Sequence, residues 1–263
     1  MYVQNVRDNV RIMRKIGVQL YTVRETMKKD YLGTLKQVAE IGYKGVELAG
    51  NMGGMTATEL RKVMDDLGLQ VVSGHCGIDA VDGDLQKTLA DYTALGAKYL
   101  GVAWIAEQYR TAEGIRRAAD LMQRAGAEAA KYGITFFYHN HAFEFETKVD
   151  GAYMLDALFA ATDPALLKWE SDVYWVSKGG EDAAAYLGRY AGRVPLVHIK
   201  DMTNDDARGF EIVGAGRLDF DKILAAGDAA GADWYIVEQD QCPKGEVESI
   251  RASYRNIVAR GWM

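Results

Sequence analysis

The sequence has few cysteines, no CxxC pair and no long apolar segment. Its two cysteines, Cys76 and Cys242, lie far apart among 263 residues. We expect free or buried thiols, although a folded chain could still bring the two together. No apolar run approaches the roughly 18 residues that cross a bilayer, so we expect no membrane-spanning helix.

Positive charge is also scarce. The chain carries 31 Lys and Arg residues against 37 Asp and Glu residues, which gives a formal net charge of −6. A nucleic-acid-binding protein normally presents a basic face, so we expect no nucleic-acid partner.

The start of the chain does not look like a targeting segment. Residues 1–15 are polar and lack the apolar centre of a signal peptide. We expect them to form an N-terminal extension of one domain that spans residues 1–263, in a cytoplasmic protein that binds no membrane. An export signal that had been removed would leave no trace in these residues.

Short β-rich segments alternate with longer amphipathic segments along the whole chain. The expected strands are Ile16–Tyr21, Gly45–Leu48, Gln70–Ser73, Lys98–Val102, Ile134–Tyr138, Leu167–Ser171, Pro195–Ile199 and Trp234–Val237. The expected helices are Leu32–Ile41, Thr58–Leu67, Leu85–Leu95, Ala112–Tyr132, Ala152–Ala160, Ala183–Tyr190, Phe220–Ala229 and Glu246–Arg260. Eight such units in about 250 residues predict an α/β fold, a single (β/α)8 TIM barrel. No GxGxxG follows the first strand, which disfavours an open, doubly wound sheet.

Polar side chains gather at the C-terminal ends of these strands, where TIM-barrel enzymes keep their active sites. All four histidines fall there and none lies in an expected helix: His75, His139, His141 and His198. The other candidates at these ends are Gln19, Tyr21, Glu47, Glu144, Glu170, Asp172, Trp175, Lys200 and Glu238. Any one of them could be structural, but their joint placement favours one shared site.

Three of these candidates predict a metal centre. Asp172, His198 and Glu238 come from the sixth, seventh and eighth strands, which are consecutive around a barrel. Carboxylates crowded at an apolar barrel mouth repel one another, and a divalent cation relieves that repulsion. Mixed carboxylate and imidazole ligands suit Mn, Co, Fe or Zn better than Ca. The expected cofactor is a divalent metal, with Mg also left open. A fourth ligand is expected from the fifth strand, either Glu144 or His139.

Together these segments resemble the xylose-isomerase-like barrel superfamily of sugar phosphate isomerases and epimerases, including its inosose-dehydratase-like branch. The resemblance covers nearly the whole chain. The motifs that carry it are YHNHAFEF (Tyr138–Phe145), ESDVYWV (Glu170–Val176), VHIKDM (Val197–Met202), EIVGAGRLDF (Glu211–Phe220) and IVEQD (Ile236–Asp240).

The resemblance implies a metal held by an acid of the fifth strand together with Asp172, His198 and Glu238. This chain has His139 where relatives place a Glu, so Glu144 is preferred as the fifth-strand ligand and His139 is the alternative. Residues implied or suggested to line the sugar pocket are Gln19, Tyr21, Glu47, His75, His141 and Trp175, with Trp104 as a further aromatic.

The implied activity is isomerisation or epimerisation of a sugar or keto-sugar, through removal of a proton next to a carbonyl. Glu238 or Glu144 would move the proton, and Lys200 would stabilise the enolate oxygen. The alternative is a lyase or dehydratase that acts on a keto-sugar, a keto-inositol or a 3-keto-glycoside through the same enolate. A non-catalytic sugar-binding subunit and a DNA endonuclease are weaker alternatives. The expected partner is a small-molecule sugar, and the protein could form a homo-oligomer.

Overall fold

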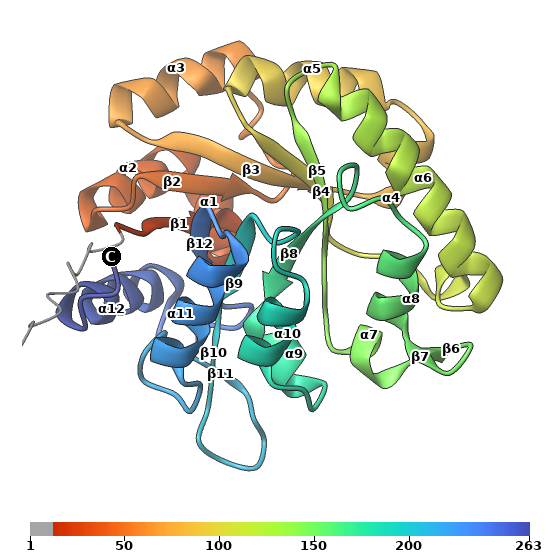
Figure 1. Ribbon diagram of the computed structural model, residues 1–263. Helices are drawn as coiled ribbons and strands as arrows, with labels where there is room; N and C mark the ends of the chain where they lie inside the picture. Colours follow the sequence, from red (N-terminus) through yellow and green to blue (C-terminus); the bar gives the residue numbers. More distant parts are fainter. Residues whose placement is uncertain (1–12) are drawn as a thin grey trace, which may run out of the picture.

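Eight parallel strands close into a barrel in the computed structural model, which describes residues 13–263 (Figure 1). The order around the barrel is β1-β12-β9-β8-β5-β4-β3-β2. The strands are β1 (Lys15–Gln19), β2 (Gly45–Leu48), β3 (Gln70–Cys76), β4 (Tyr99–Val102), β5 (Thr135–His139), β8 (Lys168–Asp172), β9 (Leu196–Ile199) and β12 (Trp234–Val237). The prediction of a single (β/α)8 barrel is confirmed.

Helices surround the strands and cover the outside of the barrel (Figure 1). They are α1 (Arg24–Lys29), α2 (Tyr31–Ile41), α3 (Ala57–Leu67), α4 (Ile78–Asp82), α5 (Leu85–Leu95), α6 (Ala112–Ala130), α7 (Phe143–Glu146), α8 (Met154–Ala160), α9 (Val173–Lys178), α10 (Ala183–Arg189), α11 (Phe220–Ala230) and α12 (Glu246–Ala259). Short 3₁₀ turns lie at Leu20–Val23 and Glu107–Tyr109.

Local sequence signals explain where the helices begin and end. Thr56 and Glu59 form a reciprocal capping box at the start of α3, which satisfies backbone N–H groups that have no partner inside the helix. Gly68 ends the same helix in the left-handed region, with φ of 66°, and Gly96 ends α5 in the same way. The next strand follows directly after each of these glycines.

The alternation of side chains along the strands places the polar site next to an apolar cluster inside the barrel. A cluster inside the barrel comprises Val72, Phe137, Leu196, Trp234 and Ile236, with Tyr99 packed against it. Side chains two residues apart share a face of a strand, so His139 follows Phe137 on the inner face of β5. In the same way His198 follows Leu196, and Glu238 follows Ile236. The polar residues at the barrel mouth are therefore continuous with its core.

Several local expectations are corrected by the structure. The first strand ends at Gln19 rather than Tyr21, because the Gln19 side chain accepts a hydrogen bond from the Tyr21 N–H and starts a 3₁₀ turn. The third strand extends to Cys76. The long connection after β9 contains a two-stranded hairpin of β10 (Asp201–Met202) and β11 (Phe210–Glu211). A second hairpin pairs β6 (Lys148–Val149) with β7 (Ala152–Tyr153).

Most of the expected N-terminal extension, residues 1–15, lies outside the described residues, and Lys15 already belongs to β1. Within residues 13–263, no helix combines the length and apolar character needed to cross a membrane. Cys76 and Cys242 are both free thiols.

Candidate functional site

A pocket of about 290 Å³ opens at the mouth of the barrel, where the strands end. Tyr21 and Trp104 form aromatic walls, and both side chains are partly exposed. The polar side chains that line the pocket are His75, His139, His141, Lys200, Glu238 and Asp240. Strands far apart in the sequence therefore contribute to one cavity.

Four buried residues at this mouth, which we call the mouth set, present possible ligand atoms to one another. His139, Asp172, His198 and Glu238 each offer one atom within 4.8 Å of the others. His198 Nδ1 lies 2.9 Å from Glu238 Oε2, and His139 Nε2 lies 3.9 Å from Asp172 Oδ2. They come from β5, β8, β9 and β12, which are consecutive around the barrel. Three of the expected ligands are thus brought together with His139.

Glu144, the preferred fifth-strand ligand and a candidate proton carrier, lies apart from this set. The Tyr138 hydroxyl donates to Glu144 Oε1, and the His141 N–H donates to Oε2 at 2.8 Å. Both oxygens are therefore engaged, in a buried position that does not line the pocket. Burial raises the pKa of Glu144 to about 7, although these hydrogen bonds oppose the shift.

Lys200 is buried among three carboxylates. Its Nζ lies 2.9 Å from Asp172 Oδ2, 2.8 Å from Glu238 Oε2 and 2.7 Å from Asp240 Oδ2. Burial alone would lower the pKa of Lys200, but the three carboxylates outweigh it and raise that pKa well above its usual value. The side chain is therefore a fixed cation at the floor of the pocket.

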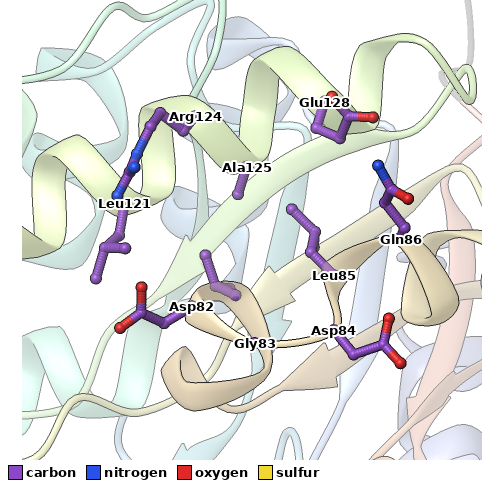
Figure 2. A pocket seen from close by; sticks show the side chains of 10 residues that line it. Asp82, Gly83, Asp84, Leu85, Gln86, Leu121, Arg124, Ala125 and Glu128 are labelled. Atoms are coloured by element: carbon purple, nitrogen blue, oxygen red, sulfur yellow. The ribbon is translucent and has the colours of Figure 1, made fainter.

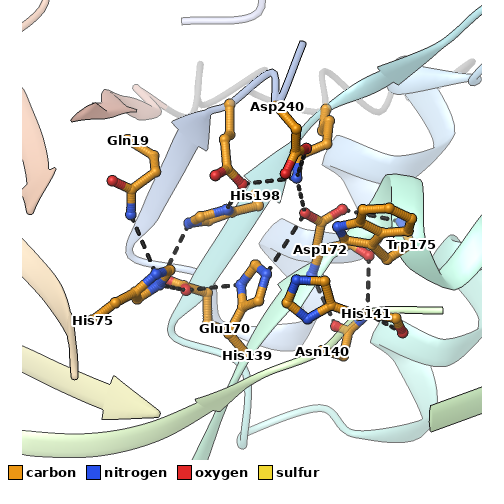
Figure 3. A network of polar contacts seen from close by, with 12 residues as sticks. Gln19, His75, His139, Asn140, His141, Glu170, Asp172, Trp175, His198 and Asp240 are labelled. Carbon is orange, nitrogen blue, oxygen red and sulfur yellow. Dashed lines mark hydrogen bonds and ion pairs between the residues drawn. The ribbon is translucent and has the colours of Figure 1, made fainter. Parts of the chain in front are cut away.

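A second polar cluster adjoins the mouth set, and Figure 3 shows its members His75 and Glu170 close to His139. His75 Nε2 lies 2.6 Å from Glu170 Oε2 and 3.1 Å from Glu47 Oε1. The opposite side of the His198 ring faces the same two acids, with Nε2 2.7 Å from Glu47 Oε1. Gln19 donates to Glu47 at 2.7 Å from the neighbouring strand. Glu47 and Glu170 are both fully buried.

Glu170 belongs to this cluster, and it was given no role among the expected site residues. Its position two residues before Asp172 on β8 was the available signal, because side chains two apart point to the same face. His139 Nδ1 lies 3.0 Å from Glu170 Oε2, so this acid also contacts a member of the mouth set.

The pKa values of the site follow from burial and from neighbouring charges. Burial disfavours protonated His75, but Glu47 and Glu170 outweigh it and raise the pKa of His75 to about 10. Burial and the other cationic groups lower the pKa of His139 well below its usual range. Burial raises the pKa of Asp172 to about 6 against the opposing effect of the Lys200 charge.

The residues expected to bind sugar divide into two groups. Tyr21, His75 and His141 line the pocket, as Trp104 does. Gln19 and Glu47 are fully buried below it, and they contact His75 rather than open space.

Trp175 lies behind one wall of the pocket. Its ring centre is 5.4 Å from that of His141, and the Lys200 ammonium lies over its face at 5.4 Å. Its place is therefore behind the pocket residues, where it limits their movement.

The donor set fits a divalent metal ion. Glu170 Oε1 is buried and accepts no hydrogen bond, and Asp172 Oδ2 accepts none of suitable geometry although Lys200 is near. Free lone pairs on buried carboxylates beside imidazole nitrogens are what a borderline cation such as Zn²⁺ or Mn²⁺ prefers.

A pocket on the outside of the barrel lacks these features. Figure 2 shows it between the α4–α5 connection and α6, lined by side chains such as Asp82, Gln86, Arg124 and Glu128. It contains no histidine, and its charges belong to exposed or partly exposed side chains. The chemistry of the described chain is concentrated at the barrel mouth.

The sequence matches known proteins over most of its length. The family description "Xylose isomerase-like TIM barrel" matches residues 35–256. An inosose dehydratase of Geobacillus kaustophilus is 28% identical over 251 residues, which cover 80% of each chain.

Solved structures share the fold. A sugar phosphate isomerase/epimerase from Parabacteroides distasonis is 26% identical with a TM-score of 0.81, and the match covers 94% of this chain and 98% of that one. The IolI protein, solved with a zinc atom, has a TM-score of 0.74 at 15% identity, over 93% of this chain and 97% of that one. The second likeness shows the fold alone.

Proposed function

The chain belongs to the xylose isomerase-like TIM barrel family, and on that premise we propose that it is a metal-dependent isomerase or epimerase of a sugar or keto-sugar. The reaction removes a proton from the carbon next to a carbonyl. The observation that supports it most is the mouth set beside a buried lysine, with His139, Glu238 and Lys200 lining one pocket. A divalent ion held by His139, Asp172, His198 and Glu238 would polarise the carbonyl or enediolate oxygen.

Glu238 is the proposed base. Its carboxylate lines the pocket, and its Oε2 is the oxygen that contacts His198 and Lys200. Oε1 is therefore the oxygen that takes the proton from carbon. Burial opposes ionisation of this group, but Lys200 and His198 outweigh it and lower the pKa of Glu238, so the carboxylate is ionised at neutral pH.

Lys200 is proposed to stabilise the oxygen that gains negative charge. Its ammonium is already held by three carboxylates, so it needs little rearrangement when that charge develops. Tyr21 and Trp104 would bind the apolar C–H face of a sugar, because their rings border the pocket.

A second candidate is dehydration or elimination through the same enolate. It is favoured by the inosose dehydratase of Geobacillus kaustophilus, to which this chain is similar over most of its length. After the same proton removal, a leaving group on the next carbon would depart as water or an alcohol. The two candidates share every residue role given above.

Product analysis distinguishes the candidates. The metal-loaded protein would be incubated with an inosose and with a 3-keto-glucoside, and the products followed by NMR and mass spectrometry. An epimer or isomer of unchanged mass supports the first proposal, and loss of water or of an alcohol supports the second. Tight metal binding without turnover of either probe would instead favour a sugar-binding subunit.

A further inference from the structure

We propose that the barrel binds a second divalent cation below the mouth set, at a deep set formed by Glu47, His75, Glu170 and Nε2 of His198. The described residues contain two overlapping groups with suitable ligand atoms. One is the mouth set, and the other comprises His75, His139, Glu170 and His198, with His139 and His198 in common. The proposal extends the proposed function, which requires an ion only at the mouth.

The ligand atoms of the deep set are almost as far apart as an ion requires. His75 Nε2 lies 2.6 Å from Glu170 Oε2 and 3.1 Å from Glu47 Oε1. His198 Nε2 lies 2.7 Å from Glu47 Oε1 and 3.3 Å from Glu170 Oε1. Ligand atoms about 2.0–2.2 Å from a tetrahedral Zn²⁺ are separated by roughly 3.3 Å. A small expansion of this ring of atoms therefore admits an ion.

Charge favours two ions rather than one. Five buried or mostly buried carboxylates face the combined cluster, and Lys200 is the one lysine or arginine that pairs with them among residues 13–263: Glu47, Glu170, Asp172, Glu238 and Asp240. Lys200 offsets one of these five negative charges, which leaves four. Two divalent cations offset the remaining four. With a single ion at the mouth, the deep acids face only the rings of His75 and His198, which a deep ion would bind in place of their protons.

The two shared histidines can each serve one ion. A neutral imidazole has one nitrogen free to bind a metal, and the other nitrogen carries a proton. If His198 binds the deep ion through Nε2, its Nδ1–H faces Glu238 Oε2 at 2.9 Å. If His139 binds the mouth ion through Nε2, its Nδ1–H faces Glu170 Oε2 at 3.0 Å. Each proton thus has the carboxylate acceptor that metal-binding histidines usually have.

This partition gives the two ions different surroundings. The deep ion has four protein ligands, Glu47, His75, Glu170 and His198, as closed zinc sites do. When the deep ion is bound, His198 leaves the ligands of the mouth ion, which keeps His139, Asp172 and Glu238 and has an open position toward the pocket. His75 lines that pocket, which provides a path of entry for the deep ion. Two imidazoles and two carboxylates favour Zn²⁺, Co²⁺ or Mn²⁺.

The number of metal ions bound per chain tests the proposal directly. The protein would be loaded with Zn²⁺, desalted and analysed by mass spectrometry of the metal. We expect two ions per wild-type chain, and one in Glu170→Gln and in His75→Ala. Ser171→Ala is the matched control, because Ser171 is a buried neighbour on β8 whose hydroxyl has no hydrogen-bond partner. This control should keep two ions.

The position of the lost ion separates this proposal from the proposed function. Anomalous diffraction at the zinc edge should show a peak between His75 and Glu170 in wild type, and that peak should be absent in Glu170→Gln. A single wild-type ion that Asp172→Asn removes and Glu170→Gln retains would overturn the deep set and leave the mouth set standing. In that case, protons on His75 and His198 offset the negative charges of Glu47 and Glu170. A single ion that Glu170→Gln removes and Asp172→Asn retains would support the deep set and overturn the mouth set.

Discussion

Lys200 is the residue whose surroundings are most unusual in this barrel. The fully buried ammonium stays charged because three carboxylates lie within 2.9 Å of its Nζ. Two of them, Asp172 and Glu238, are also proposed metal ligands. The lysine and the metal would therefore contact the same acids, which limits the directions in which each carboxylate can point.

Replacing Lys200 with methionine tests its catalytic role. Lys200→Met keeps the length of the side chain and all four residues of the mouth set. We expect turnover to fall by about 10²-fold or more, because the developing oxyanion loses its charged partner. Metal binding, measured by calorimetry, should persist. Lys222→Met, at an exposed ion pair with Asp182, is the control. Unchanged turnover in Lys200→Met would contradict the assigned role.

The raised pKa of Glu144 predicts that the unfolding free energy depends on pH. Burial raises its pKa from 4.5 to about 7. The protonated form therefore makes its full contribution to the unfolding free energy below pH 4.5, and that contribution is lost as the pH rises through 7. Glu144→Gln mimics the protonated form and lacks this loss. Between pH 5 and pH 8, wild type should lose about 2 kcal/mol more unfolding free energy than the variant.

Urea unfolding at the two pH values measures this difference. Glu146→Gln is the control, since Glu146 is exposed on the same short helix, α7. Its curves should change with pH as those of wild type do. Parallel behaviour of wild type and Glu144→Gln would show that Glu144 does not titrate as described.

The choice between His139 and Glu144 shows what could be predicted from the sequence at this scale. Asp172, His198 and Glu238 were predicted because each lies at the end of an expected strand, and these three strands are consecutive around a barrel. His139 lies on β5 and obeys the same rule. Glu144 follows five residues later, where the backbone turns into α7, and no period fixes the direction of its side chain there. Its contacts with Tyr138 and His141 depend on that turn.

The long connection after β9 is organised by one side chain. Asp201 accepts hydrogen bonds from the backbone N–H groups of Met202, Gly214, Gly216 and Leu218, at 2.7–3.2 Å. Gly216 packs so closely that a Cβ would lie 2.4 Å from Asp201 Oδ1. Because Asp201 directly follows Lys200, this loop also anchors the end of β9 that carries the lysine.

Asp201→Asn should loosen the loop. The amide has one oxygen, so it can satisfy only two of the four N–H donors, and its NH₂ group faces the others. We expect a loss of about 2 kcal/mol in unfolding free energy and faster hydrogen exchange at Gly214 and Gly216. Exposed Asp206 lies on the same connection, and Asp206→Asn is the control. Equal stability of the two variants would contradict the anchoring role of Asp201.

The elements themselves were predicted most accurately where the pattern was long. The helix expected from Leu85 to Leu95 has those bounds, since a capping Asp84 and a terminal Gly96 frame it. Short elements such as α9 and the β10–β11 hairpin were not predicted. The α9 segment contains six residues, and its stability depends on the capping side chain of Asp172 and on tertiary packing. Such contacts cannot be inferred from local propensity.

At the scale of the whole molecule, metal binding should be part of folding stability. A ligand that binds only the native state stabilises it by an amount that grows with the logarithm of its concentration over Kd, and that reaches about 2.7 kcal/mol at 100-fold excess. For a chain of this size we expect a chelator to lower the Tm by about 5 °C or more. Zn²⁺ or Mn²⁺ should restore it, and Ca²⁺, which prefers oxygen ligands, should restore it less. Identical Tm values with and without chelator would contradict a bound ion.

Exchange of a substrate proton is the most direct measurement of the central claim, which is metal-dependent removal of a proton next to a carbonyl. The metal-loaded protein would be incubated in D₂O with an inosose or a 3-keto-glucoside, and the carbon next to the carbonyl followed by NMR. Wild type should introduce deuterium at that carbon, in recovered substrate or in product, whereas the chelated protein and Glu238→Gln should not. Turnover by wild type without any deuterium at that carbon would contradict the account.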